Sequence, residues 1–450
     1  MPAIFGIPGL VICVLLISAC TLPEDPWPDP QLIIVNMADL HSAHDAYPGI
    51  LATVRQLSEQ HDRERLVVLI NGDIFEPGNA VARRSEAQGD WAFLTRLTEH
   101  AKVVTNLGNH EFDFLPPDKF MARAEALGLA VIGNIGTRER PNLAPGRIDL
   151  DLDGETLAII GLGTDAINTY PQALRDELLL PDPVTWMHEN HQRLTEGVDH
   201  LIIASHAGIV ADRAISEHLA GDSRILFYVG GHNHMMLHED LKGIPYMHNG
   251  FGGEMINITA ITKSGGTIRL DSHNLHLAEM TETDPDLSAL LASLDERYLD
   301  EDDLRIIGKV EQALTLSEAA AWAAEQISRA TDADISLVNH TSFGAGLPAG
   351  GLPQFRFDAF LRFDNPVMVA TVKGPTLRSI LALNDPRNGH YLYASPLQPA
   401  DEKEYVLATT RWVAMEANQE RYLGTRLVFE EVTGLTTRQI LLQALKETER

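Results

Sequence analysis

Short apolar runs, each ending in a polar turn and followed by a stretch with helical spacing, recur through the first 280 residues. Runs of this length that are rich in β-branched residues are typical of buried strands, and their alternation with helices is typical of a layered α/β domain. Helices are predicted over 50–60 and 85–100. The predicted strands cover 31–37, 66–70, 103–106, 130–133, 157–162, 201–205 and 225–229, with 254–263 and 267–277 as antiparallel strands.

Residues 281–303 change character. They are acidic and place Leu287, Leu290, Leu291 and Leu294 on one helical face, so a linker helix is expected here. Residues 304–450 have their own predicted helix (317–330) and strands (335–338, 366–372 and 405–409), and they are long enough for an independent core. The sequence therefore predicts an α/β domain over 31–280 and a smaller α/β C-terminal domain over 304–450.

The N-terminus has a separate pattern. Residues 4–17 are almost wholly apolar, are too short to span a bilayer as a stable helix, and lead to Ser18-Ala19-Cys20. This arrangement is typical of a secretory leader and resembles the lipobox of bacterial lipoproteins, in which the cysteine is lipidated. We expect 1–20 to be a signal peptide, Cys20 the lipidation site, 21–30 a proline-rich tether, and the body a periplasmic or outer-membrane lipoprotein. An uncleaved anchor is the alternative, because no Lys or Arg precedes the apolar run.

Composition restricts the partners and the chemistry. The 450 residues include 35 Lys and Arg against 63 Asp and Glu, which gives a net charge of −28. Nucleic-acid polymers are therefore not expected as partners, because their binding depends on basic residues that neutralise phosphates. The only two cysteines, Cys13 and Cys20, lie in the leader. This excludes a disulfide framework, a thiolate nucleophile and Cys-ligated zinc in the body.

Polar residues follow five of the predicted strands: Asp39-Leu40-His41, Gly72-Asp73, Gly108-Asn109-His110-Glu111-Phe112-Asp113, Ser205-His206 and Gly231-His232-Asn233-His234. Open sheets gather ligand-binding groups at such strand ends. Carboxylate, imidazole and amide donors in this number suit a two-metal hydrolytic centre. The candidate donors are Asp39, His41, Asp73, Asn109, His110, His206, His232 and His234, which is one histidine more than seven ligands need, and Asp113 is placed to orient the imidazole of His110.

These motifs, in this order, resemble those of the calcineurin-like metallophosphoesterases. The Gly-Asn-His-Glu-Phe-Asp sequence and the two-domain length resemble the branch of 5'-nucleotidases and UDP-sugar hydrolases. The resemblance implies a four-layer α-β-β-α sandwich followed by a substrate-binding domain. It also implies two metal ions, one held by Asp39, His41, Asp73 and His234 and the other by Asp73, Asn109, His206 and His232. His110 would then face the substrate phosphate without binding metal.

The implied function is a dinuclear-metal phosphoesterase that hydrolyses nucleotide 5'-phosphates or related small-molecule phosphate esters with metal-activated water. Donors that are all nitrogen or oxygen leave Mn, Zn, Fe, Co and Ni open. Two alternatives stay open. The same metal core would act on a cyclic nucleotide, a sugar phosphate or a thiosulfo ester, or the protein would be a non-catalytic ligand-binding lipoprotein. The complete His110–Asp113 pair favours an enzyme, and the oligomeric state is not predicted.

The C-terminal domain resembles the 5'-nucleotidases less closely. Arg362-Phe363-Asp364-Asn365 resembles the segment of that family that carries a base-stacking ring, and the segment around Trp412 resembles a second one. Phe363 and Trp412 are therefore candidate substrate-binding residues, with core packing as the alternative. The arginine of the family's Asn-x-Gly-x-x-Arg turn is missing after Asn339. The candidate substitutes are Arg356, Arg362 and Arg411.

Histidines outside these motifs are expected to be solvated or to support the site rather than to form another metal site. His188 and His191 lie three apart on an expected helix, and His273 and His276 on an expected strand. His248 follows a strand near the proposed ligands and is a candidate for contact with them.

Overall fold

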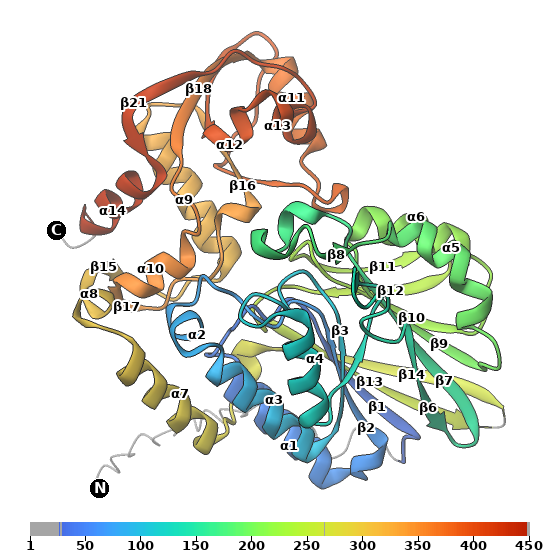
Figure 1. The fold of residues 1–450 in the computed structure, drawn as a ribbon. Coiled ribbons are helices and arrows are strands. Elements are labelled where there is room, and N and C mark those ends of the chain that lie inside the picture. The colour runs from blue at the N-terminus through green and yellow to red at the C-terminus, as the bar shows by residue number, and fades with distance from the viewer. Residues whose placement is uncertain (1–26, 28, 265, 448–450) are drawn as a thin grey trace, which may run out of the picture.

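The structure is a computed structural model that describes Trp27, residues 29–264 and residues 266–447. It has an N-terminal sandwich of two sheets and a C-terminal domain seated on one end of it (Figure 1). The predicted leader, including Cys20, and most of the predicted tether lie outside the described residues. Within the described ranges, no helix is both long enough and apolar enough to cross a membrane.

Two six-stranded sheets form the centre of the N-terminal domain. The first has the order β14-β13-β1-β2-β3-β4, and its strands β1 to β4 are parallel. The second has the order β11-β12-β10-β9-β7-β6, with β12, β10, β9 and β7 parallel. The first sheet consists of β1 (Leu32–Met37), β2 (Leu66–Asn71), β3 (Lys102–Asn106), β4 (Ala130–Ile132), β13 (Met255–Ser264) and β14 (Thr267–His276). The second consists of β6 (Arg147–Leu152), β7 (Glu155–Gly163), β9 (His200–His206), β10 (Ile225–Gly230), β11 (Met236–Leu241) and β12 (Ile244–Asn249).

Both faces of the central strands are buried, which is why their sequences are continuous apolar runs. In β1, Leu32 and Ile34 pack between the two sheets, whereas Ile33 and Val35 pack against the helices on the outer face. Helices cover each sheet, so the predicted α-β-β-α sandwich is confirmed (Figure 1). These helices are α1 (Tyr47–Gln60), α2 (Ala80–Ser85), α3 (Gln88–His100) and α4 (Pro117–Ala126) on the first sheet, and α5 (Pro183–Leu194) and α6 (Ile209–Leu219) on the second. A short two-stranded sheet joins β5 (Gly136–Thr137) and β8 (Leu178–Leu179).

Helix α7 (Pro285–Tyr298) leads from the sandwich to the C-terminal domain (Figure 1). Asp284 caps its first turn by accepting from the backbone N–H of Leu287. Its leucines Leu287, Leu291 and Leu294 are buried in the same cluster as the helices of the first sheet. The connection is therefore packed onto the sandwich.

The C-terminal domain is built on a five-stranded sheet of order β19-β16-β20-β18-β21 with helices on both faces. The smaller α/β domain expected from the sequence is confirmed. Its strands are β15 (Ile306–Val310), β16 (Ile335–Asn339), β17 (Gly350–Pro353), β18 (Pro366–Lys373), β19 (Leu392–Ala394), β20 (Glu404–Thr410) and β21 (Glu430–Thr436). Its helices are α8 (Glu301–Leu304), α9 (Leu316–Ala330), α10 (Gln354–Phe360), α11 (Gly374–Leu383), α12 (Arg411–Ala414), α13 (Glu416–Leu423) and α14 (Thr437–Glu447).

Candidate metal centre

The backbone turns sharply at the strand ends that carry the candidate ligands. Strand β1 ends at Met37, and both Asp39 and His41 then adopt left-handed φ angles of 52° and 49°. Asp73, after β2, has a φ of 56°. Non-glycine residues rarely adopt this conformation, and such strain concentrates at functional sites. The turn after β1 ends the strand, and both Asp39 and His41 lie in this turn beside the candidate ligands of the neighbouring strand ends.

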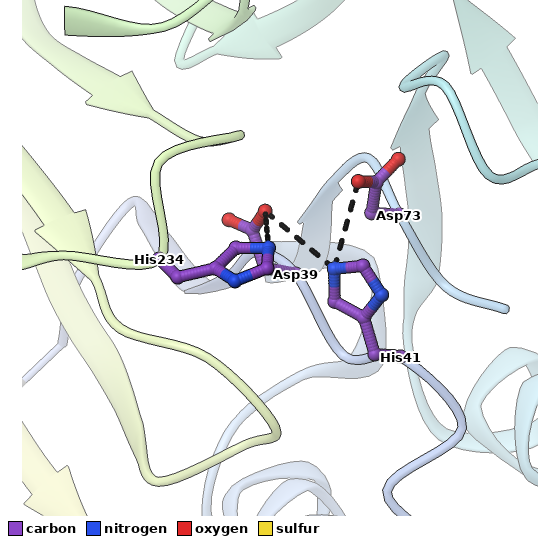
Figure 2. A group of neighbouring side chains, drawn as sticks. All are labelled: Asp39, His41, Asp73 and His234. Carbon is purple, nitrogen blue, oxygen red and sulfur yellow. Dashed lines mark ion pairs between the residues drawn. The ribbon is translucent and has the colours of Figure 1, made fainter. Parts of the chain in front are cut away.

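One group of ligands surrounds Asp39. The Nε2 atom of His41 lies 3.5 Å from an Asp73 carboxylate oxygen and 3.9 Å from Asp39, and the Nε2 atom of His234 lies 3.6 Å from Asp39 (Figure 2). One ligating atom from each of these four residues lies within 4.8 Å of the others, so they could hold one metal ion. We call Asp39, His41, Asp73 and His234 the first metal position.

A second group shares Asp73. His206 Nε2 lies 3.0 Å from Asp73 Oδ2, and His232 belongs to the same potential metal-binding group. The Oδ1 atom of Asn109 lies 2.9 Å from His232 Nδ1. Metal bonds of about 2.0–2.2 Å place neighbouring ligand atoms roughly 3 Å apart, which matches these distances. We call Asp73, Asn109, His206 and His232 the second metal position; the structure thus brings all seven candidate ligands together.

The buried imidazoles of the site fit a cation. His206 donates from Nδ1 to the carbonyl of Asn71 at 2.7 Å, which leaves Nε2 directed toward Asp73. That Nε2 atom and both ring nitrogens of His41 are buried without a hydrogen-bond partner among the described residues. A ring nitrogen that faces a carboxylate is favourable only with positive charge between them, either a proton or a metal ion. The donor set is therefore suited to divalent cations that accept nitrogen and oxygen ligands.

The charge states agree with this fit. Burial, with the neighbouring His206, lowers the pKa of His232 to about 4, and burial also lowers the pKa values of His41 and His234. For Asp39, burial raises the pKa but the histidines around it, His206 first, lower it to about 2. At neutral pH these groups are therefore in the forms that bind metal. Burial lowers the pKa of His206 as well, but Asp73 and Asp39 raise it to about 10, because the carboxylates attract positive charge to this point.

His110 lies beside the ligands and pairs with Asp113. Its Nδ1 atom is 2.5 Å from the Asp113 carboxylate. Burial lowers the pKa of His110, but Asp73 and Asp113 outweigh this effect and raise it to about 9. The backbone N–H groups of Asn109 and His110 both donate to Asp73 Oδ1, at 2.8 and 2.9 Å. The turn thus holds the Asp73 carboxylate in place and presents the imidazole of His110 next to it.

Two residues that the sequence analysis gave no role fix these turns. The Glu111 carboxylate accepts from the backbone N–H groups of Ile74 (3.0 Å) and Gly108 (2.6 Å), and so it ties the turn after β3 to the turn after β2. Asn233 accepts from the N–H of Ile209 at 2.7 Å and donates to the carbonyl of Gly389 in the C-terminal domain at 3.2 Å. Glu111 stood inside the recognised motif, whereas the long-range partner of Asn233 has no signal in the sequence.

Glycines at two of these turns allow close approach. Gly72 has a φ of +81°, and a Cβ there would lie 2.5 Å from His206 Nδ1. A Cβ at Gly108 would lie 2.4 Å from Asp73 Oδ1. A side chain at either position would displace a candidate ligand.

The remaining candidates are distributed as follows. Phe363 and Trp412 are 56% and 45% exposed, so neither side chain belongs to the core. Arg411 pairs with Glu431 inside the C-terminal domain, whereas Arg356 pairs with Asp45 and Arg362 with Glu76, both across to the sandwich.

His188 stacks on His218 with ring centroids 3.7 Å apart and a 24° interplanar angle, and His191 lies near Asp222. His273 and His276 are exposed, and His248 is fully buried and near enough to contribute to the field at Asp39.

The comparisons with known proteins agree with the fold and the site. The family model for the calcineurin-like phosphoesterases matches residues 32–236, and this part of the chain belongs to that family. The match spans every candidate ligand from Asp39 to His234, and it defines the class as metal-dependent phosphoester hydrolase. A search of curated proteins by sequence finds no match.

Solved structures share the two-domain architecture. A 5'-nucleotidase precursor from Thermus thermophilus is 17% identical, covers 93% of this chain and 96% of its own, and has a TM-score of 0.61. The sulfate thiohydrolase SoxB from Thermus thermophilus is 13% identical, covers 94% and 95%, and has a TM-score of 0.63. A 5'-nucleotidase from Candida albicans is 13% identical, covers 94% and 98%, and has a TM-score of 0.61. At these identities the likeness establishes the fold.

Proposed function

We propose that this protein is an exported phosphoesterase that hydrolyses nucleotide 5'-phosphates or closely related phosphate esters at a dinuclear metal centre. The observation that carries the proposal is the position of Asp73, whose carboxylate takes part in both four-residue metal positions. A carboxylate that bridges two cations brings them to about 3.5–4 Å from each other, the spacing of two-metal hydrolases.

Each residue of the site has a distinct part in this proposal. The seven candidate ligands would hold two cations, and Asp113 fixes the ring of His110 through Nδ1, which leaves Nε2 for the substrate. Two bound divalent cations would polarise a phosphoryl oxygen and lower the pKa of a coordinated water. His110, whose pKa Asp73 and Asp113 raise above its ordinary value, would donate a hydrogen bond to the phosphoryl group as negative charge develops on its oxygens. In a chain with a net charge of −28, such local positive charge is needed to hold an anionic ester.

The space between the domains suits an ester with a sizeable leaving group. A cavity of about 500 Å³ extends from His234 to the C-terminal domain, where Tyr391 and Tyr393 line it. Phe363 and Trp412 present exposed rings on the same domain. Aromatic rings of this kind stack on planar bases, which favours nucleotides over small aliphatic phosphates.

Hydrolysis assays test the proposal. Release of p-nitrophenol from p-nitrophenyl phosphate should depend on added divalent metal and stop with EDTA. A panel of AMP, UDP-glucose, cyclic AMP and sugar phosphates should then show the highest kcat/KM for a nucleotide. A metal-loaded protein that releases no phosphate from any of these esters would contradict the proposal and favour a binding protein.

The export part of the proposal concerns the leader. We expect Cys20 to be lipidated after cleavage and to hold the protein at a membrane surface. Membrane fractions of cells that express the full chain should contain the protein, and Cys20→Ser should release it or leave the leader attached. Recovery of both proteins from the soluble cytoplasmic fraction would contradict this assignment.

A further inference from the structure

The C-terminal domain makes three contacts with the residues that surround the metal ligands. Arg362 forms an ion pair with Glu76, and Glu76 Oε2 lies 3.4 Å from Nδ1 of His41. Phe251 packs its ring against His41 and belongs to a hydrophobic cluster whose other members lie in the C-terminal domain. The carbonyl of Gly389 accepts from Asn233, which separates two candidate ligands. The residues that contact the C-terminal domain therefore also contact candidate ligands or lie next to them in the chain.

The Arg362 contact is the one of the three that joins two charged side chains. The stem of Arg362 lies against Gly344, where a Cβ would come within 2.8 Å of it, and the backbone N–H of Arg362 donates to the carbonyl of Ser342 at 3.0 Å. Its side chain is 14% exposed, and the side chain of Glu76 is 11% exposed. The arginine is thus held by its own domain and directs its charge into the sandwich.

The carboxylate of Glu76 lies beside the imidazole of His41. Its Oε1 atom accepts from the backbone N–H of Gly78 at 2.7 Å, which leaves Oε2 for Arg362 and for His41 Nδ1. The 3.4 Å separation is longer than an ordinary hydrogen bond, but a carboxylate beside the outer nitrogen of a metal-binding imidazole favours a proton on that nitrogen and so fixes the tautomer and the orientation of the ring. With the proton on Nδ1, the Nε2 lone pair of His41 faces Asp39 and Asp73.

Glu76 could also act in a competing way. Its carboxylate, His41 and His110 form a third group whose ligating atoms lie within 4.8 Å of one another. A buried carboxylate without a positive partner would turn toward a metal ion or take up a proton. The guanidinium of Arg362 supplies that partner and holds Glu76 in its position beside His41.

We propose that Arg362 is a positioning residue of the metal centre, which acts through Glu76 to orient His41 and thereby sets the affinity of the first metal position. This inference rests on the metal sites of the proposed function but not on the substrate or the turnover. The C-terminal domain would then contribute to metal binding as well as to substrate recognition.

The chain offers a matched control. Arg356, on α10, forms a two-pronged ion pair with Asp45 and also joins the two domains. The side chain of Asp45 is 66% exposed and lies at the surface. Arg356→Gln therefore breaks an ion pair between the domains without reaching the metal ligands.

The test is a calorimetric titration of the metal-free full-length protein with Mn²⁺. Wild type should bind two ions, and Asp39→Asn, which removes a ligand of the first position only, identifies the corresponding step. Arg362→Gln should weaken that step about 10–100-fold and leave the other within twofold, since loss of such outer partners typically has this effect. Arg362→Lys should lie between wild type and Arg362→Gln, and Arg356→Gln should match wild type.

A double variant removes the ambiguity of misfolding. Arg362→Gln leaves Glu76 buried and unpaired, whereas Arg362→Gln with Glu76→Gln removes both charges. If Arg362 acts through Glu76, the double variant should bind metal at the first position as weakly as Glu76→Gln alone. Equal effects of Arg362→Gln and Arg356→Gln would overturn the proposal, as would unchanged metal affinity with a raised KM, which would mean that Arg362 touches the substrate. Two-ion binding without hydrolysis in wild type would count against the proposed function only.

Discussion

The sandwich and the C-terminal domain position their candidate functional residues in different ways. On the sandwich side, every candidate ligand lies within or no more than four residues beyond one of the strands β1, β2, β3, β9 and β10, which are parallel within their sheets. In the C-terminal domain, the candidate residues Phe363 and Trp412 and the cavity-lining Tyr391 come from separate loops and helix starts, and the first two are exposed. Metal chemistry needs ligands held to a fraction of an ångström, which rigid strand ends provide, whereas ligand recognition tolerates looser supports.

Among the residues of the sandwich, Asp73 should be the one whose substitution has the largest effect on metal binding and turnover. Asp73→Asn should remove metal from both positions and lower turnover by roughly 10³-fold or more, because the centre supplies several kcal/mol to the transition state. Metal content per chain, measured by mass spectrometry, checks this. Asp118→Asn, a change at an exposed carboxylate that pairs with Arg140, is the control and should keep two ions. Retention of one ion by Asp73→Asn would contradict a bridging role.

Substitution of His110 should lower turnover without loss of bound metal. His110→Ala should keep both ions but lower kcat by about 10²–10⁴-fold, the usual contribution of a positioned proton donor. Parallel metal analysis and steady-state kinetics on the same preparation measure the two effects. If the ions are lost together with the activity, His110 is a ligand and its separation from the seven ligands is wrong.

Changes on the C-terminal side should be smaller and should depend on the substrate. Phe363→Ala and Trp412→Ala should each raise the KM for AMP about tenfold, since stacking on one base is worth about 1–3 kcal/mol. The KM for glycerol phosphate, which has no ring, should stay within twofold. Val428→Ala, at a side chain that is 87% exposed on the same domain, is the control. Equal changes for both substrates would remove these rings from base recognition.

The smallest expected effect is that of Asp212, on helix α6, which packs against the second sheet. This buried carboxylate accepts hydrogen bonds from Ser205 (2.6 Å), Tyr228 (2.9 Å) and Tyr246 (2.9 Å). Burial raises its pKa from 3.8 to about 7 against the effect of these donors. Between those values the folded state keeps a proton that the unfolded state has lost, so this group lowers stability as pH rises toward 7.

Asp212→Asn should remove that part of the pH dependence. The thermal unfolding temperature, measured from pH 5 to pH 8, should fall less steeply for the variant than for wild type, while other titrating groups affect both proteins alike. Parallel curves for the two proteins would show that Asp212 does not hold its proton in the folded state.

The parts of the molecule that depend on short stretches of sequence could be predicted. Asp39, Asp73 and Asn109 each follow an apolar run, and the order of β1, β2 and β3 along the chain is also their order in the sheet. A strand that ends in a polar turn therefore indicated both its own position and its ligand.

Elements without that local signal were missed. Strand β11 lies at the edge of the second sheet, and its residues are mostly exposed or half-buried, so it lacks an apolar run. Glu76, Phe251 and Asn233 each also contact a residue of the C-terminal domain that lies far along the chain. Such contacts depend on how two domains pack, and no periodicity in a single sequence encodes them.

Anomalous diffraction from crystals grown with Mn²⁺ tests the central claim most directly. The account predicts two manganese peaks about 3.5–4 Å apart, with the Asp73 carboxylate between them and His110 next to them but bound to neither. A single peak, or two peaks that do not share Asp73, would contradict it.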